Sequence, residues 1–290
     1  MFDNIFAAIE KWMRELLTGM VESNMSTMFT DVNEKTSEIA AQVGRTPQNW
    51  NSSVFSMIQN LSESVVVPIA GIIITLVLCY ELISMLTERN NLHDVDTWMF
   101  FKYFVKAWVA IYLVSNTFTI TMAVFDVGQS VVNSASGIIN GETAIDVSSL
   151  SMQMQAAMAT MEIGELVVLA LETFLVSFCM KIMSVVITVI VYGRMIEIYL
   201  YTSLAPIPFA TMSNREWCHV GTNYFRGLFA LAFQAFLMMV CVAIYAALIS
   251  SVRISSNMHS ALIGVAAYTV ILCFSLMKTG SLSKQIFGSH

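Results

Sequence analysis

Residues 192–217 read YGRMIEIYLYTSLAPIPFATMSNREW, a largely apolar stretch that contains charged side chains and two prolines. An isolated charge at the centre of a bilayer costs about 2.5–3.5 kcal/mol, so such a side chain is usually paired, interfacial or turned toward protein or water. Arg194 and Glu197 stand three residues apart on one side of a helix, where they can neutralise each other. Two interpretations are open: an interfacial ion pair that ends a long helix, and a structural hinge.

The two prolines interrupt this helix. Pro206 and Pro208 lack a backbone donor and disfavour helical geometry in the residue before them, so we expect the helix to end near Leu204 or Ala205. Broken backbone at membrane depth is tolerated only where protein or water surrounds it. We therefore expect residues 195–212 to form a cytoplasmic-side continuation or a re-entrant element rather than a simple span.

The composition of the whole chain is that of a membrane protein. Hydrophobic residues make up 57% of the 290 residues and charged residues 12%, with a mean hydropathy of +0.70. Soluble domains carry about 25% charged residues. The predicted fold class is an all-α polytopic membrane bundle. The net charge of -6 gives no overall basic surface for nucleic acid.

Five apolar segments are candidates for membrane-spanning helices, each near the length of about 20 residues that crosses the hydrocarbon core. In chain order they are residues 65–86, 99–124, 166–192, 227–250 and 261–277, the last at the lower limit of about 17 residues. They belong to a transmembrane domain over residues 64–290, with an exterior loop at 125–165 and a cytoplasmic-side segment at 193–226. Within the loop, Ser149 to Thr160 is a candidate helix.

The distribution of charge sets the predicted orientation. The loop 125–165 has no Lys or Arg and five acidic residues, Asp126, Glu142, Asp146, Glu162 and Glu165. Basic residues flank the opposite ends of the spans, at Arg89, Lys102, Lys106, Arg194, Arg215, Arg226, Lys278 and Lys284. Since cytoplasmic loops carry the excess of Lys and Arg, we expect the loop and the N-terminus outside and the C-terminus in the cytoplasm. Among the loops between spans, Arg253 is the one basic residue on the wrong side.

Residues 1–63 are expected to form a separate exterior module with two amphipathic stretches. In the first stretch, apolar residues recur at helical spacing opposite charged ones, at Phe2, Ile5, Phe6, Ile9, Trp12, Leu16 and Met20. This pattern indicates a helix that lies on a membrane surface or docks on a partner and does not span the bilayer. The second stretch places Val32, Ile39 and Val43 on one face and ends near Gly44.

The third predicted span carries polar residues at steps of four, four, three and four, which places them in one narrow wedge of a helix. This polar stripe consists of Thr173, Ser177, Lys181, Ser184 and Thr188. One interpretation is a water-exposed or pore-facing surface. The other is helix packing through small polar residues, with Lys181 paired to a carboxylate of another span. Glu172 is excluded as that carboxylate, because it lies on the opposite side of the helix.

The residue types that usually carry catalysis or metal binding show no organised pattern. Five cysteines and four histidines are scattered, with no CxxC and no short metal-ligand spacing. The sequence has no phosphate-binding P-loop, no GxGxxG after a strand and no HExxH. We therefore expect no catalytic, cofactor-binding or metal-binding residue, and any energy source must belong to a partner. Gln234 in the fourth span is expected to form an interhelical hydrogen bond.

Four blocks of the sequence together resemble one family. They are NNLHDVDTWMFFK (90–102), FDVGQSVVNSASGII (125–139), the stretch 192–217 quoted above, and KTGSLSKQIFGSH (278–290). In these blocks, which extend over nearly the whole chain, the sequence is similar to the TrbL-like conjugal transfer proteins of Gram-positive integrative and conjugative elements. The resemblance implies a polytopic subunit of a type IV secretion system in the bacterial cytoplasmic membrane, which moves relaxase-bound single-stranded DNA from donor to recipient.

The resemblance also implies partners, but it supplies no catalytic residues. It implies a homo-oligomeric ring in membrane lipid, secretion ATPases on the cytoplasmic side, small exterior secretion subunits, and transient contact with single-stranded DNA. The broken stretch then becomes a candidate cytoplasmic junction, made of Arg194, Glu197, Pro206, Pro208 and Arg215. The expected function is a noncatalytic channel or assembly-platform subunit. A secondary transporter of a small solute and a structural membrane scaffold are the alternatives.

Overall fold

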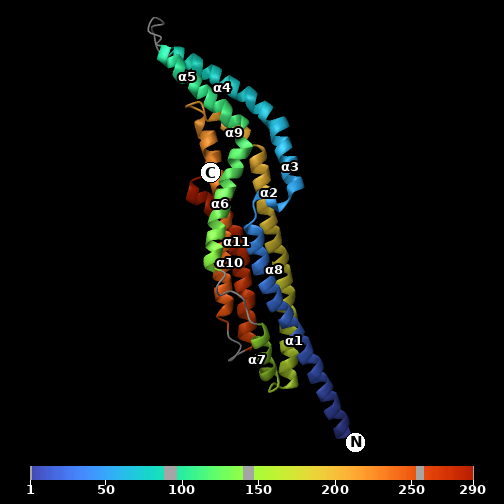
Figure 1. The fold of residues 1–290 in the computed structure, drawn as a ribbon. Coiled ribbons are helices and arrows are strands. Elements are labelled where there is room, and N and C mark those ends of the chain that lie inside the picture. The colour runs from blue at the N-terminus through green and yellow to red at the C-terminus, as the bar shows by residue number, and fades with distance from the viewer. Residues whose placement is uncertain (1, 88–96, 140–146, 253–257, 290) are drawn as a thin grey trace. The chain divides into compact units, whose positions relative to one another are not determined.

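The computed structural model describes residues 2–87, 97–139, 147–252 and 258–289, and within these ranges the regular structure is helical, with no strand (Figure 1). Arg89, Glu142, Asp146 and Arg253, which enter the charge argument, lie outside the described residues. Five helical stretches are long and apolar enough to cross a membrane: Ser52–Thr87, Thr97–Ser115, Ile163–Ser203, Cys218–Ser250 and Met258–Phe287. The prediction of an all-α polytopic bundle with about five spans is therefore confirmed.

The helices follow one another through short connections. In chain order they are α1 (Phe2–Val43), α2 (Pro47–Trp50), α3 (Ser52–Leu61), a π-helical turn η1 (Ser62–Val66), α4 (Val67–Thr87), α5 (Thr97–Ser115), α6 (Thr117–Ile139), α7 (Val147–Met158), α8 (Ile163–Ser203), α9 (Pro206–Thr211), α10 (Cys218–Ser250) and α11 (Met258–Phe287). Helix α7 confirms the helix expected within the segment 125–165. The stretch predicted as one span at 99–124 is divided at Asn116 into α5 and α6.

The π-helical turn η1 stands directly before the proline of α4. Pro68 lacks a backbone N–H, and its ring crowds the carbonyl group four residues earlier, which a regular α-helix cannot accommodate. The wider π turn makes room for the ring while the chain remains helical. The helical stretch Ser52–Thr87 is therefore continuous although it contains a proline.

Helix α8 is longer than a bilayer requires. Its 41 residues extend about 60 Å at about 1.5 Å per residue, whereas the hydrocarbon core is about 30 Å thick. Even a strongly tilted α8 therefore projects beyond the hydrocarbon core.

Internal contacts divide the chain into two compact units. The first unit consists of Met1–Val43, Ser134–Val191 and Met238–Lys278, and the second consists of Gly44–Asn133, Tyr192–Leu237 and Thr279–His290. Helices α8, α10 and α11 contribute residues to both. The predicted boundary at residue 63 falls within the continuous helical stretch Ser52–Thr87, and the Tyr199 hydroxyl of α8 donates a 2.6 Å hydrogen bond to the carbonyl oxygen of Pro47. The exterior placement of residues 1–63 stays a prediction.

In the first unit, α1 is one continuous helix whose two halves differ in exposure. Its C-terminal half buries an apolar face, which confirms the predicted face and consists of Val21, Met25, Met28, Phe29, Val32, Ile39 and Val43. Its N-terminal half leaves large apolar side chains exposed, from 45% for Met20 to 68% for Phe6. Arg14 Nη1 donates a hydrogen bond to the carbonyl oxygen of Met161 at 2.8 Å, so part of this half is held at the turn before α8.

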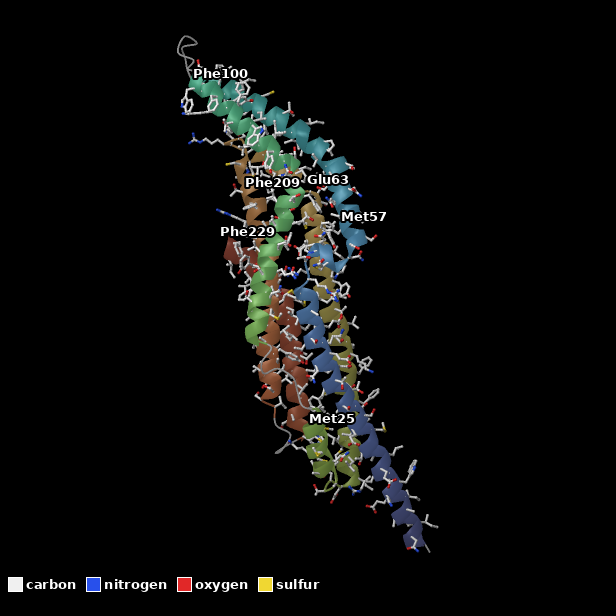
Figure 2. All side chains as sticks on the ribbon, in the orientation of Figure 1. Met25, Met57, Glu63, Phe100, Phe209 and Phe229 are labelled. Atoms are coloured by element: carbon white, nitrogen blue, oxygen red, sulfur yellow. The ribbon has the colours of Figure 1, made fainter. Side chains whose placement is uncertain are left out.

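In the second unit, two apolar clusters hold the helices together. The first joins α4, α5, α9 and α10 through Ala70, Ile74, Leu78, Ala110, Val114, Ala205, Phe209, Ala210 and Tyr224; Figure 2 labels Phe209 on α9. The second joins α6, α8 and α10 through Val124, Phe125, Met195, Ile198, Leu228, Leu231 and Ala232. The short helix α9 is thus part of a core and not a free loop.

The contact between α9 and α10 depends on a glycine. A Cβ atom at Gly221 would stand 2.6 Å from the carbonyl oxygen of Pro208 and 2.1 Å from Met212 Cγ. Gly221→Ala should therefore overpack this contact and lower the free energy of unfolding by about 1–3 kcal/mol, measured as a lower midpoint of thermal unfolding in detergent.

A matched control for this substitution lies in α8. A Cβ atom at Gly193 would meet nothing within 4 Å, and alanine is favoured over glycine in a helix by about 1 kcal/mol. Gly193→Ala should leave the unfolding midpoint unchanged or raise it. Equal midpoints for the two variants would contradict the close approach at Gly221.

Candidate functional site

The polar stripe of α8 lies against α1 within the first unit. Thr173 Oγ1 accepts a hydrogen bond from Asn24 Nδ2 at 3.5 Å, and Thr188 Oγ1 accepts one from Lys35 Nζ at 3.2 Å. Because the residue numbers of both helices rise together from the first pair to the second, α1 and α8 run parallel here. The stripe is therefore the surface of α8 on which α1 packs within a single chain.

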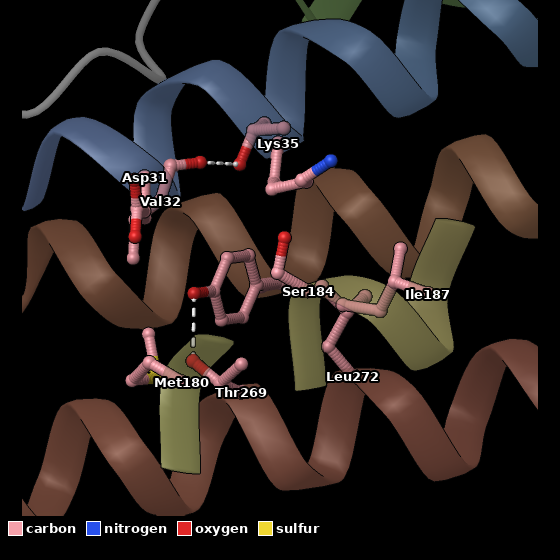
Figure 3. A pocket seen from close by; sticks show the side chains of 10 residues that line it. Asp31, Val32, Lys35, Met180, Ser184, Ile187, Thr269 and Leu272 are labelled. Carbon is pink, nitrogen blue, oxygen red and sulfur yellow. Dashed lines mark hydrogen bonds between the residues drawn. The ribbon is translucent and has the colours of Figure 1, made fainter. Parts of the chain in front are cut away.

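Ser184, the fourth member of the stripe, lines a small cavity in the first unit (Figure 3). Asp31 and Lys35 of α1 reach its wall, together with Tyr245 of α10 and Thr269 of α11. The hydroxyl groups of Tyr245 and Thr269 are hydrogen-bonded at 2.9 Å. A volume of about 20 Å³ has room for a single water molecule. The cavity is too small to hold a transported solute.

Ser177 and Lys181 lie nearer the surface than the two threonines. Ser177 is half-buried and Lys181 is exposed. Within the described ranges Lys181 forms no ion pair with a carboxylate. Glu172 instead pairs with His259 Nδ1 at the start of α11, which agrees with its exclusion as the partner of Lys181.

Arg194 and Glu197 do not form the expected pair. Arg194 is 6% exposed, and its Nη2 donates a hydrogen bond of 3.4 Å to the carbonyl oxygen of Leu231 on α10. Its Nε is buried without an acceptor among the described residues. Glu197 instead accepts a 3.0 Å ion pair from Lys284 of α11. No ion pair joins the two side chains, because each turns to a different neighbouring helix.

The helix break lies where the prolines predicted it. Helix α8 ends at Ser203 and α9 begins at Pro206, which confirms an end near residues 204–205. Ala205, Pro206 and Phe209 are buried, in contact with α4 and α5. Pro208 is half-buried, and its carbonyl oxygen accepts a hydrogen bond from Thr211 Oγ1 at 2.7 Å. Protein thus surrounds the broken backbone.

Two tyrosines fasten the end of α8 to α10. The rings of Tyr201 and Tyr224 stack with centroids 4.4 Å apart. Each hydroxyl donates to the carbonyl oxygen of the other residue, at 3.2 Å from Tyr201 and 2.6 Å from Tyr224. The break leaves the Tyr201 carbonyl without its usual donor, because the N–H of Ala205 bonds to Thr202 instead. The Tyr224 phenol therefore replaces a backbone donor.

A polar network beside the break was not predicted from the sequence. Asn214 is 2% exposed; its Oδ1 accepts from the backbone N–H of Glu216 at 2.7 Å, and its Nδ2 donates to Glu81 Oε2 at 3.2 Å. Glu81 also pairs with Lys106 at 2.5 Å. The only sequence signal was an Asn before an apolar helix, which is typical of an N-terminal cap. Arg215, beside this network, is exposed.

Gln234 confirms its predicted contact between helices. Its Nε2 donates to Thr279 Oγ1 of α11 at 3.5 Å, and a Cβ atom at Gly280 would stand 3.2 Å from that nitrogen. No group of three or more His, Cys, Asp or Glu side chains that could hold a metal ion occurs in the described part of the chain.

Comparison with known proteins identifies a family. The family model described as "TrbL/VirB6 plasmid conjugal transfer like protein" matches residues 32–206, which is more than half of the chain. No curated protein and no solved structure matches the chain. The matched region runs from the last third of α1 to Pro206 and so includes the polar stripe and the junction residues Arg194 and Glu197.

The parallel packing of α1 on α8 predicts a specific cross-link. In a variant without the native cysteines, Asn24→Cys with Thr173→Cys should be joined by a short bifunctional thiol reagent, because these side chains meet. Mass spectrometry of the linked peptides detects the cross-link. Asn24→Cys with Phe178→Cys is the matched control, since Phe178 lies on the exposed face of α8. Linkage of both pairs, or of neither, would contradict the packing.

Substitutions at Arg194 test whether its charge stabilises the fold. An incompletely compensated buried charge carries a desolvation cost that an apolar side chain of similar length does not carry. Arg194→Met should therefore retain or raise the unfolding midpoint in detergent. Arg194→Ala should lower the free energy of unfolding by about 2–5 kcal/mol through the space it leaves. A large loss of stability in Arg194→Met would show that the charge itself holds the fold together.

Proposed function

The chain belongs to the family of TrbL/VirB6 plasmid conjugal transfer-like proteins, and from this premise we propose that it is a noncatalytic channel or assembly-platform subunit of a conjugative type IV secretion system. The family makes the chain a multi-pass membrane component of conjugal transfer. In the proposed role it supports the transfer of single-stranded DNA with bound relaxase. The match over residues 32–206 carries this proposal.

The orientation proposed from the charge pattern assigns a role to each end of the bundle. With the N-terminus outside and the C-terminus in the cytoplasm, the acidic segment 125–165 and the exposed first turns of α1 meet small exterior secretion subunits. The segment 193–226 then meets the secretion ATPases. Further copies of the chain surround it in membrane lipid as a ring.

The residues around the helix break suit a docking site for an ATPase. Ala205, Phe209 and Ala210 are buried against α4 and α5, so the break is held by the protein's own core. Asn214 fixes the start of α10 through its bond to Glu81. Arg215 is exposed on this fixed support, where it can contact a partner at little conformational cost.

The cavity at Ser184 does not suit the alternative of a secondary transporter. Such transporters hold their substrate near the bilayer midplane between broken helices. The cavity at Ser184 accommodates about one water molecule. Buried Arg194 is engaged with Leu231 and Met195. The observations therefore favour an assembly or conduit role over solute transport.

The direct test is a conjugation assay in a deletion strain. Loss of DNA transfer, with recovery on expression of the chain, is the expected result. Transfer at the wild-type frequency in the deletion strain would overturn the proposed function. Substrate-dependent ion flux in liposomes that contain this protein alone would favour the transporter instead.

Charge reversal tests the junction separately. Arg215→Glu places a repulsive charge at the proposed ATPase contact, which should reduce the transfer frequency by about tenfold or more while the protein still accumulates in the membrane. Lys11→Glu is the matched control, because Lys11 has a side-chain exposure of 79% on the proposed exterior side. It should change transfer by less than about twofold. Equal effects of the two substitutions would count against docking at Arg215.

A further inference from the structure

The outer surface of α1 is polar where the helix lies along α8. Its exposed residues recur at steps of three and four, which places them on one face. Between residues 23 and 37 they are Ser23, Ser26, Thr30, Glu34 and Ser37, here called the α1 strip. The opposite face of the same length is buried and apolar, with Met25 (labelled in Figure 2), Met28 and Val32 among its members.

The outer surface of α8 beside the strip is apolar. Phe174, Phe178, Ile182, Val185 and Val189 are exposed by 46–64%. The contacts Asn24 to Thr173 and Lys35 to Thr188 put the two surfaces at the same height in the first unit. One side of this unit is therefore apolar and another side polar at the same depth.

The two sides cannot both face hydrocarbon favourably. The α8 surface suits lipid tails, because burial of apolar area stabilises it and no polar group is stranded. On α1, Thr27 and Thr36 donate hydroxyl hydrogen bonds to their own helix at 2.8 Å, so hydroxyls alone would tolerate lipid. The carboxylate of Glu34 would not, since a charged side chain at bilayer depth costs about 2.5–3.5 kcal/mol.

Lys181 adds a second charge on the α1 side. It lies in the wedge of α8 that also holds Thr173 and Thr188, the two residues that contact α1. It is exposed and unpaired with any carboxylate of the described chain. A lysine at the border between a lipid surface and a water surface extends its ammonium toward the water.

We propose that the α1 strip lines an aqueous lumen enclosed by further copies of this chain, with the outer face of α8 turned to lipid. This proposal places residues 26–37 at the depth of the α8 span and so replaces the expected exterior placement of the whole segment 1–63. This inference rests on the proposed ring, because one chain supplies one wall and water at bilayer depth needs walls on all sides. It assigns the lumen to Ser26, Thr30, Glu34 and Ser37 of α1, with Lys181 at the rim.

The charge of this lining predicts whether it binds a nucleic acid. Glu34 is the one charged residue of the α1 strip, and Lys181 lies at its rim. Affinity for phosphates comes from clustered Lys and Arg, and single strands are also held by aromatic stacking. The strip has neither a basic cluster nor an aromatic residue. It is a surface along which a single strand passes without being bound.

Cysteine accessibility tests the lumen. In a variant without native cysteines, single Cys substitutions at Ser26, Thr30 and Ser37 are treated in intact cells with a membrane-impermeant cationic thiol reagent. Labelling should be at least about tenfold faster there than for Phe178→Cys and Val185→Cys, because the reactive thiolate forms in water and not in hydrocarbon. Thr160→Cys, in the exposed turn after α7, reports full access.

The outcomes separate the alternatives. Labelling of the strip and of Thr160→Cys without labelling of the α8 positions supports the lumen. Absence of labelling on the strip, with Thr160→Cys labelled, overturns it in favour of a strip covered by protein. Labelling of the α8 positions as well overturns it, because neither surface would then face lipid. If the strip is labelled while the deletion strain still conjugates, the proposed function fails and the aqueous surface stands.

Substitution of Glu34 provides a second readout in the native cysteine background. A hydrophobic side chain in a lumen expels water and obstructs passage, so Glu34→Leu should reduce DNA transfer by about tenfold, with membrane levels unchanged. Glu34→Gln keeps the side chain polar and of similar size and is the matched control, with transfer retained. If Glu34→Leu accumulates and transfers as well as the wild type, the strip does not face water.

Discussion

The structure depends on one rule of the bilayer: a backbone polar group without water must find its partner in the protein. Two prolines after Leu204 break that rule locally, because they end the helical ladder and leave carbonyl groups of α8 without donors. The Tyr224 hydroxyl donates a hydrogen bond to the carbonyl oxygen of Tyr201. Apolar side chains of α4 and α5 pack on α9. The close approach at Gly221 then follows, because α10 must lie near enough to α9 to supply these contacts.

The features that follow from local chemistry could be read from the sequence. Long apolar runs predicted five spans, and the prolines predicted the helix end between α8 and α9. The partners of Arg194 and Glu197 could not be read in this way. Leu231 and Lys284 lie 37 and 87 residues along the chain, and no periodicity states which helices become neighbours. The bond from Asn214 to Glu81 across 133 residues escaped prediction for the same reason.

For α1, the sequence pattern predicts the apolar faces but not the surfaces that they contact. Its apolar spacing predicted a face in each half, and the structure buries the face with Val32 and Ile39 but leaves the face with Phe6 and Trp12 exposed. Amphipathic spacing predicts that an apolar face is buried, but it does not predict whether the same chain, lipid or another subunit buries it. The polar stripe had the same ambiguity. It proved to contact α1 through Thr173 and Thr188, a neighbour that neither sequence interpretation had named.

The tyrosine pair also has a consequence for biosynthesis. Tyr201 and Tyr224 are 23 residues apart in the chain, and a ribosome adds about 5–20 residues per second. For about one to five seconds after Tyr201 is made, its carbonyl group therefore has no Tyr224 hydroxyl to accept from. During this interval the C-terminal end of α8 lacks this hydrogen bond. The pairing of the last carbonyl groups of α8 is therefore completed only when α10 has been synthesised.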